Sequence, residues 1–443
     1  MKKKKVQLSN LAIIIAAIGA IGGFLFGYNT AVISGALLIF SDLFNLSLAA
    51  KANVVSILIF GALIGAIVSG FLSDKLGRKY TVIFTAIVYV IGSFLLTFTD
   101  SFVTLLFGRF ITGLGVGLGS LVVPLYLSEM APVKFRGAMV TANQLMVTIG
   151  ILVSYIANFY LDTAKIWPWL FIISIIFSLI LFVCMFFLPE SATWLITKGK
   201  KVKAKKILRK VRKGENVDTI IAKVEKNMKK PLKKTSMKKK LMGALVVGVG
   251  LSIIQQITGV NAVFYYAPSI FQEVGFVTRS SAMLATIALG AINVIATVVA
   301  MWLLDLKGRR PLLLVGVAGM FLGLIFLSIC FFIGPSLTAF SLFSLMFYVV
   351  FFAIGLGPIA WLIISEIFPL AVRGRVMGIC VFVNWASNYV VSLCFLPLTK
   401  YVGSAWTFVI FAIITFFSFF FVYFRVPETK GRSLEEIEAF WKK

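Results

Sequence analysis

Several carboxamide side chains lie in the middle of long apolar stretches, where a polar group is costly unless it is used. A carboxamide donates and accepts hydrogen bonds without carrying charge. Two indoles lie close to some of these amides, so the set suits a neutral ligand rich in hydroxyl groups with apolar faces. The alternative is that the amides serve only as hydrogen bonds between helices. The residues are Gln144, Gln255, Gln256, Asn261, Asn293, Asn384 and Asn388, with Trp361 and Trp385.

The spacing of these amides favours helices as their support. Gln255 and Gln256 are adjacent, so about 100° separates them on a helix, and both face one cavity only from a wide interior face. Gly259 is a place where that helix can bend before Asn261. Asn384 and Asn388 lie one turn apart on one helical face, and Trp385 lies between them in sequence.

The composition indicates a membrane protein. Of 443 residues, 60% are hydrophobic, against about 45–50% in soluble domains, and the mean hydropathy is +1.02. The net charge of +27 is concentrated in short segments between apolar runs, which is typical of the positive-inside rule and argues against nucleic-acid binding. The chain has no histidine, and its cysteines show no disulfide or metal-ligand spacing, so we expect neither a metal nor a cofactor.

Apolar runs of about 20 residues predict six membrane spans, a basic loop and six more spans. The chain is therefore expected to be an all-α membrane protein with twelve transmembrane helices in two six-helix halves and short linker helices. The expected spans are 11–40, 53–72, 80–98, 103–127, 138–161 and 168–188, and then 241–270, 282–304, 311–333, 339–367, 376–400 and 405–425.

The loops predict the orientation and the division of the chain. Basic residues gather in the even-numbered connections, so these loops and both termini are expected in the cytoplasm, with the protein in the plasma (inner) membrane as a multi-pass chain. The linker is rich in lysine and has apolar residues at helical spacing, which predicts amphipathic helices at the cytoplasmic surface that touch anionic lipid headgroups. The expected parts are an N-terminal half (1–188), a linker (189–240), a C-terminal half (241–425) and a cytoplasmic tail (426–443).

Charged loop motifs occur twice, offset by about 230–240 residues, which indicates duplication of one half. Two parallel halves are typical of transporters, with the substrate site between them near the bilayer midplane. Each half holds an Asp-x-x-Gly-Arg motif and a Ser-Glu…Arg-Gly motif, and we expect their charged residues to form ion pairs at the cytoplasmic face that break as the halves rock. The alternative is a plain anchor at the membrane edge. These residues are Asp74, Arg78, Glu129 and Arg136, and then Asp305, Arg309, Glu366 and Arg373.

Further motifs join these along nearly the whole chain. Together they resemble the sugar porters of the major facilitator superfamily, which include bacterial xylose and glucose proton symporters and animal glucose facilitators. The resemblance implies the major facilitator fold, with halves related by a pseudo-two-fold axis, and transport of a monosaccharide by alternating access. The additional motifs are Gly27-Tyr28, Ile33-Ser34-Gly35, Gly108-Arg109-x-x-x-Gly113, Pro124-x-Tyr-x-Ser-Glu129, Pro189-Glu-Ser-x-x-Trp194, Gln255-Gln256-x-x-Gly-x-Asn261, Gly357-Pro-x-x-Trp361 and Pro427-Glu-Thr-Lys-Gly431.

The resemblance also implies roles for individual residues. The family's sugar ligands match the amides and indoles above apart from Asn384, which is added because it clusters with Trp385 and Asn388. Phe26 and Tyr265 are expected to line the same cavity. In the family's proton symporters an aspartate stands where this chain has Asn29, and it pairs with the arginine that matches Arg109. An amide cannot take up a proton, which predicts uniport; symport through another carboxylate is the alternative.

Other functions are less well supported by the residues. A membrane sugar sensor is expected to carry a long cytoplasmic tail, and this tail is short after Pro427. An intramembrane enzyme would need a catalytic group, and no paired carboxylates occur in the middle of a span. One chain holds a complete pathway, so a monomer is expected to function. Protons are partners only in the symport alternative, and the sequence leaves open which hexose or pentose is carried.

Overall fold

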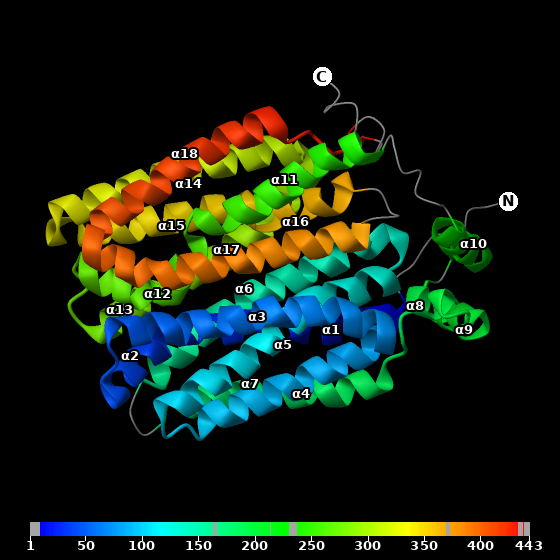
Figure 1. Ribbon diagram of the computed structural model, residues 1–443, viewed down its shortest axis with the longest axis horizontal. Helices are drawn as coiled ribbons and strands as arrows, with labels where there is room; N and C mark the ends of the chain where they lie inside the picture. The colour runs from blue at the N-terminus through cyan, green and yellow to red at the C-terminus, as the bar shows by residue number, and fades with distance from the viewer. Residues whose placement is uncertain are drawn as a thin grey trace. The chain divides into compact units, whose positions relative to one another are not determined.

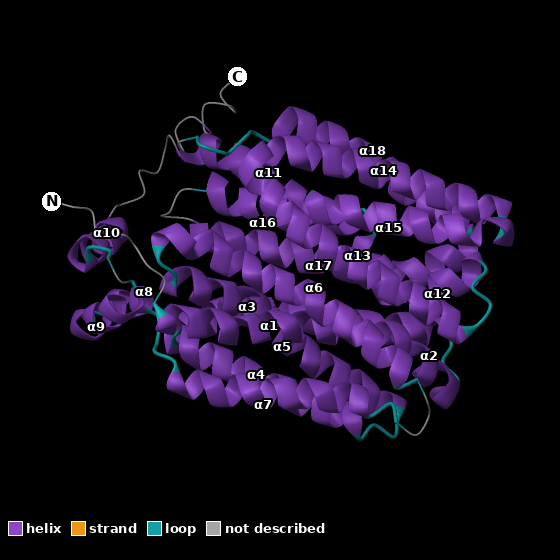
Figure 2. Cartoon of the chain, turned by 180° about the vertical axis from the view of Figure 1, so that it is seen from behind, coloured by secondary structure: helices purple, strands orange, loops and turns teal. Residues whose placement is uncertain are grey.

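The computed structural model describes residues 9–162, 166–212, 214–229, 237–368, 373–432 and 437, and within these ranges it contains helices and no strand. The side chains of Asp305 and Arg373 lie outside the described part. Figures 1 and 2 show the helices and their short connections.

Twelve spans are long and apolar enough to cross a membrane, which confirms the prediction of twelve transmembrane helices. Three spans are each built from two consecutive helices, at the first, seventh and tenth positions. The helices of the first half and linker are α1 (Asn10–Ala31), α2 (Ile33–Phe44), α3 (Leu48–Leu76), α4 (Arg78–Thr97), α5 (Phe102–Met130), α6 (Arg136–Tyr160), α7 (Trp169–Phe187), α8 (Ala192–Thr197), α9 (Lys201–Val211) and α10 (Val217–Lys229). The later helices are α11 (Met237–Ile257), α12 (Val260–Val274), α13 (Arg279–Lys307), α14 (Arg309–Ile333), α15 (Thr338–Ile354), α16 (Leu356–Ile367), α17 (Arg373–Val402) and α18 (Ser404–Arg425).

The seventh span is interrupted where the sequence predicted a bend. Gly259 has φ +91°, a conformation that glycine adopts without strain, and it separates α11 from α12. The interruption frees backbone carbonyls that lipid cannot satisfy. The Tyr348 hydroxyl donates to the Thr258 carbonyl at 2.9 Å. Pro268 has no N–H for the Phe264 carbonyl one turn earlier, and the Tyr155 hydroxyl donates to that carbonyl at 2.9 Å.

The described residues divide into two compact units that do not follow the order of the sequence. Unit 1 comprises Met1–Asn29, Gly61–Gly150 and Phe171–Leu232, and unit 2 comprises Thr30–Phe60, Ile151–Leu170 and Lys233–Lys443. Helices α1, α3 and α6 therefore each pass from one unit to the other. The proposed division into sequence halves stays a prediction.

Close helix packing holds unit 1 together. Helix α4 packs along α5. The part of α3 from Gly61 onward approaches α5 so closely that a side chain at either of two glycines would clash with the backbone of the other helix. A Cβ at Gly65 would lie 2.3 Å from the Leu114 carbonyl oxygen, and one at Gly117 would lie 2.0 Å from that of Ala62. The glycine-rich stretch of α5 thus serves helix packing.

In unit 2, α14 packs against α15 and α18, and α11 packs against α17; α14 and α18 lie side by side in Figures 1 and 2. The end of the first span also belongs to this unit, where α2 packs against α12. Residues from both sequence halves therefore meet inside unit 2.

The linker forms a small helical cluster of its own. Helices α8, α9 and α10 bury a shared core that includes Leu195, Ala204, Leu208 and Val217. The short linker helices that were predicted are present, and their apolar faces pack on one another. Lysines cover the outer face of α9.

Candidate functional site

A chain of hydrogen-bonded amides joins α11, α12, α16 and α17 within unit 2. Asn261 Nδ2 donates to Gln256 Oε1 at 2.6 Å, and Gln256 Nε2 donates to Asn384 Oδ1 at 3.1 Å. Asn384 Nδ2 then donates to Gln255 Oε1 at 2.8 Å. Gln255 Nε2 ends the chain on the backbone carbonyls of Leu356 and Gly357, at 2.9 and 3.2 Å.

Backbone carbonyls fix the direction of this chain. A carbonyl only accepts, so Gln255 must present its NH₂ group to α16, and Asn384 must present its own to Ser252 O at 3.1 Å. Each following amide is oriented in turn. Asn384 and Gln255 therefore each donate two hydrogen bonds to protein groups and accept one through the side-chain oxygen. Asn261, which is partly exposed, keeps its Oδ1 and one N–H without a hydrogen-bond partner among the described residues.

A second polar group lies further along α17. Asn388 Nδ2 donates to the Tyr265 hydroxyl at 3.1 Å, and Ser392 Oγ donates to Asn388 Oδ1 at 3.1 Å. Trp385 is 5% exposed and Trp361 is partly exposed. The structure thus brings the amides and aromatics of the seventh and eleventh spans together, as their positions in sequence suggested.

The remaining candidates lie elsewhere. Asn293 is buried in α13, where its carbonyl accepts from Thr297 Oγ1 at 2.8 Å. Gln144 on α6 and Phe26 on α1 are partly exposed and belong to unit 1. Their convergence with the amide chain on one sugar stays a prediction.

Asn29 and Arg109 are both buried within unit 1, each 1% exposed. Arg109 Nη1 donates to the backbone carbonyl of Asn29 at 3.2 Å. The Asn29 side chain has other contacts: its Nδ2 donates to Leu25 O at 2.9 Å, and its Oδ1 accepts from Ser174 Oγ at 2.9 Å. Ser93 Oγ donates to Ser174 Oγ at 2.9 Å. The amide is therefore held in a neutral hydrogen-bond network.

The charged motif of the first half forms a compact cluster in unit 1. Arg78 Nε lies 3.0 Å from Glu129 Oε2, and Arg78 Nη1 lies 3.3 Å from Asp74 Oδ1. Ser191 Oγ also donates to Glu129. Glu190 Oε1 accepts from the backbone N–H groups of Arg78, Lys79 and Ser191. Burial raises the pKa of the Glu190 carboxyl above its usual value, although these N–H groups lower it in part.

The corresponding cluster in unit 2 repeats this plan. Arg309 Nη2 lies 3.1 Å from Glu366 Oε1, and Thr429 Oγ1 donates to Glu366 in the place of Ser191. Glu428 accepts from the backbone N–H groups of Arg309, Arg310, Thr429 and Lys430. Burial alone raises the pKa of Glu428, but these four N–H groups outweigh it and leave that pKa below its usual value.

One described member of the predicted gate stands apart from these pairs. Arg136 is exposed, and among the described side chains it forms no ion pair. The first cluster instead gains Arg212 from the linker, whose Nη2 donates to the Glu129 carbonyl at 2.7 Å. Asp305 and Arg373 were also predicted to pair, and their side chains lie outside the described residues.

A third ionic contact, which the sequence did not indicate, ties elements within unit 2. Arg279, at the start of α13, places Nη1 3.1 Å from Asp42 Oδ2 on α2 and Nη2 2.6 Å from Asp162 Oδ1, beyond the end of α6. Burial raises the pKa of the Asp162 carboxyl, and Arg279 offsets part of that rise. Arg279 comes from the second half of the sequence and both acids from the first.

Sequence reasoning missed several residues that hydrogen-bond to the polar groups of the spans and loops and hold them in place. Ser174 holds Asn29, Tyr348 and Tyr155 satisfy freed carbonyls, and Glu190 and Glu428 collect backbone N–H groups. The Pro-Glu-Ser and Pro-Glu-Thr repeats were visible signals for the two acids. A serine or tyrosine in a span carried no comparable signal.

Comparison with known proteins decides the family. The profile of the family described as sugar (and other) transporter matches residues 15–441. The chain belongs to this sugar transporter family. It is 38% identical to the major myo-inositol transporter IolT of Bacillus subtilis over 99% of this chain and 96% of that protein. It is also 38% identical to the glucose transporter GlcP of Staphylococcus epidermidis over 96% of each chain.

Solved structures show the same fold. The proton:xylose symporter XylE of E. coli, bound to 6-bromo-6-deoxy-D-glucose, matches with a TM-score of 0.84 and 32% identity over 97% of this chain and 99% of that one. The prediction of a major facilitator fold is thereby confirmed. The chain is a multi-pass membrane transporter of a family that moves sugars and catalyses no chemical reaction.

Proposed function

We propose that this transporter carries a monosaccharide by alternating access and works as a uniporter. The observation that carries the proposal is the oriented amide chain, which ends at Asn261 with free donor and acceptor capacity. A sugar hydroxyl needs both kinds of partner. The names of the relatives, which act on glucose, myo-inositol and xylose, support a polyol of this size.

The roles within the site follow from which hydrogen-bonding positions are already used. Asn261 and Gln256 meet sugar hydroxyls, together with Asn388 and Asn293. Gln255 and Asn384 hold Gln256 in place. Trp361, Trp385 and Tyr265 supply apolar surface for the sugar ring, and Phe26 and Gln144 stay predicted members of the site.

Uniport is supported by the surroundings of Asn29. Its side chain has no titratable proton, and both of its ends take part in neutral hydrogen bonds with Leu25 and Ser174. The proposal includes a plasma-membrane location with both termini cytoplasmic, function as a monomer, and contact of the basic linker with anionic lipid headgroups. The two carboxylate clusters supply the ion pairs that open and close during the cycle.

Proteoliposomes test the substrate and the coupling in one preparation. Counterflow with labelled glucose, xylose and myo-inositol measures which polyol exchanges, and an imposed pH gradient then measures accumulation. We expect exchange without uphill accumulation. Proton-driven accumulation would replace uniport by symport, and an absence of exchange for every sugar would overturn sugar transport itself.

Alanine variants test the amide chain. Asn261→Ala and Gln256→Ala should each weaken sugar binding by about 10–100-fold, since a lost hydrogen bond in a buried site costs roughly 1–3 kcal/mol. Gln272→Ala is the matched control: it lies on the same helix, is partly exposed and should bind normally. Normal affinity in both test variants would contradict the proposed roles.

An Asn29→Asp variant tests the coupling position. The new carboxylate would be a titratable group between the Leu25 carbonyl and the buried guanidinium of Arg109, whose Nη1 donates to the carbonyl of residue 29. We expect transport to become dependent on pH in the neutral range. Asn158→Asp is the control, because Asn158 Nδ2 also donates to a backbone carbonyl, that of Val32, yet has no proposed part in coupling. Equal pH profiles for both variants would remove Asn29 from the mechanism.

A further inference from the structure

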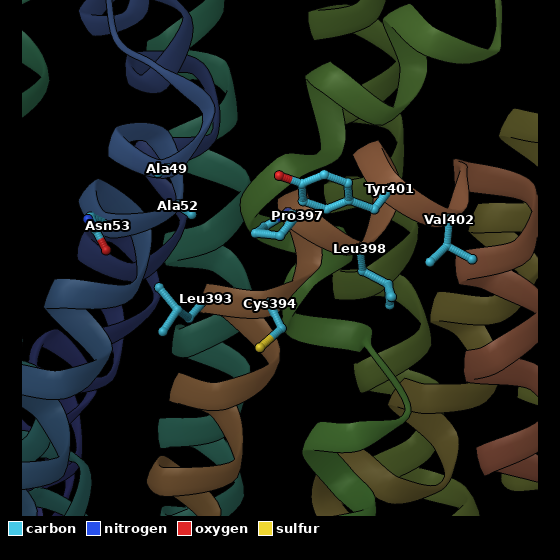
Figure 3. Close-up of a pocket in the computed structure, with 9 residues that line it drawn as sticks. All are labelled: Ala49, Ala52, Asn53, Leu393, Cys394, Pro397, Leu398, Tyr401 and Val402. Atoms are coloured by element: carbon cyan, nitrogen blue, oxygen red, sulfur yellow. The ribbon is translucent and has the colours of Figure 1, made fainter.

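An apolar groove within unit 2 has no part in the proposed sugar pathway. Its volume is about 410 Å³, within the roughly 300–1,000 Å³ of ligand pockets. One wall is the first turns of α3 and the other is the last turns of α17 (Figure 3). The lining residues are Ala49, Ala52, Asn53, Leu393, Cys394, Pro397, Leu398, Tyr401 and Val402.

The lining repeats at helical spacing on both walls. On α17 it recurs about every four residues, and on α3 it uses two alanines that leave space beside the helix. Asn53 and the Tyr401 hydroxyl are the polar side-chain groups of the lining, and in Figure 3 that hydroxyl lies on the side facing α3. So few hydrogen-bonding groups suit a hydrocarbon chain and would leave the hydroxyls of a sugar unsatisfied.

A cation flanks the groove at one end. Lys400 precedes Tyr401 in the last turn of α17. The Lys400 ammonium lies 5.9 Å from the centre of the Tyr401 ring, which is itself 82% exposed. Both helices meet the membrane surface here, because α3 begins at Leu48 and α17 ends at Val402. Tyrosine and lysine at this depth are typical of the level of lipid headgroups.

We propose that the groove binds one acyl chain of a glycerophospholipid, whose phosphate lies at Lys400. The lipid comes from the leaflet on the side of the α2–α3 connection. An apolar lining, an interfacial tyrosine and a cation match the three parts of such a lipid: its chain, its ester region and its phosphate. The lipid thereby bridges a helix of the first sequence half and a helix of the second.

Cys394 gives a direct measure of occupancy. It is the exposed member of the four cysteines and it lines the groove. Purified, delipidated transporter in dodecyl maltoside is titrated with palmitoyl-oleoyl-phosphatidylglycerol, and the rate of alkylation at Cys394 by N-ethylmaleimide is followed by peptide mass spectrometry. We expect saturable protection of about tenfold or more, because a covered thiol reacts slowly. Glycerol phosphate alone should give no protection.

Charge variants test the headgroup contact. One lysine at a lipid surface changes affinity about fivefold, so Lys400→Gln should require roughly fivefold more lipid for half protection. Lys75→Gln, at the opposite end of α3, is the control and should behave as the parent. Thermal unfolding of each variant checks that the fold is intact.

A bulky side chain placed in the groove tests its contact with the acyl chain of the lipid. Cys394→Trp introduces bulk from an exposed position, and it should lower the amount of phospholipid that copurifies, as counted by native mass spectrometry. Ile413→Trp, at an exposed site of α18, is the matched control. The proposal is overturned if protection fails to saturate, if glycerol phosphate protects equally, or if Cys394→Trp retains as much lipid as its control.

Discussion

The two charged clusters share one plan and differ in burial and support. In unit 1, the side chains of Arg78 and Glu129 are each 11% exposed, and the linker adds contacts through Ser191 and Arg212. In unit 2, Arg309 and Glu366 are 19% and 28% exposed. Duplication preserved the pairing of an arginine with an acid, while the linker made the first cluster a deeper one.

The two acids that accept hydrogen bonds from backbone N–H groups, Glu190 and Glu428, also differ between the clusters, and they are called the backbone caps below. Glu190 gathers its hydrogen bonds on Oε1, and its Oε2 is buried with no hydrogen-bond partner among the described residues. Glu428 uses both oxygens. Each acid lies against a glycine with positive φ, Gly77 at +103° and Gly308 at +91°. Similar geometry therefore gives opposite pKa shifts, because burial outweighs the N–H groups at Glu190, whereas four N–H groups outweigh burial at Glu428.

Replacement of the central arginine should give the largest difference in unfolding free energy between the two clusters. Arg78→Gln leaves a buried carboxylate unpaired, which costs about 3–5 kcal/mol, whereas Arg309→Gln should cost roughly 1–2 kcal/mol because water reaches its partner more easily. Thermal unfolding in detergent micelles measures both. Equal losses would mean that burial does not distinguish the two clusters.

The linker contact should have the next largest effect. Arg212 is buried and donates to the Glu129 carbonyl, so Arg212→Gln loses a charged hydrogen bond worth about 1.5–3 kcal/mol. Its release should speed tryptic cleavage of the lysine-rich linker. Arg209→Gln, an exposed neighbour on α9, is the control. Cleavage rates that match for the two variants would show that Arg212 does not clamp the linker.

The two backbone caps should respond oppositely to neutralisation. The pKa of Glu428 is lowered in the folded state, so its charge stabilises the fold above the unfolded pKa of about 4.3, and that stability is lost as pH falls through the folded pKa. Glu428 is partly exposed, so solvent screening weakens this effect, and Glu428→Gln should cost about 0.5–1 kcal/mol at pH 7. The difference from the parent should disappear in acid.

Glu190 has a raised pKa, so its charge opposes folding above the folded pKa, and protonation relieves this as pH falls. Glu190→Gln should thus be neutral or stabilising at pH 7. Unfolding temperatures across pH 4–8 measure both variants. Losses of the same sign at pH 7 would show that the two caps are electrostatically alike.

The smallest effect, and the one expected to be equal in both clusters, concerns the next basic residue. Lys79 Nζ donates to Phe186 O at 2.8 Å, and Arg310 Nη2 donates to Tyr423 O at 2.6 Å. Both side chains are outside the buried pairs. Alanine at either position should cost about 0.5–1 kcal/mol of unfolding free energy. A clear difference between them would extend the asymmetry to the rim of the clusters.

The parts predicted well from the sequence are those set by hydropathy and duplication. The twelve spans, the break at Gly259 and the pairing of Arg78 with Glu129 follow from apolar run length, a glycine and a repeated motif. The meeting of Gln256 with Asn384 followed from their shared depth in two spans.

The parts missed depend on backbone groups that a sequence does not display. The direction of the amide chain is set by the carbonyls of Leu356 and Ser252, which become available only once the helices are placed. The contact of Arg109 with the backbone carbonyl of Asn29 likewise depends on where the two helices lie. The sequence likewise could not show that Ser174 would hold that side chain.

The ion pairs of Arg279 with Asp42 and Asp162 have a consequence for how salt on each side of the membrane acts on the protein. Asp42 is 76% exposed and Arg279 30% exposed, so dissolved ions can reach the contact, and at physiological ionic strength screening acts over about 8 Å. The charged clusters beside α4 and α14 occupy other loops, at the opposite ends of their spans. Salt added to one compartment should therefore weaken the ion pairs at that end of the spans and spare those at the other end.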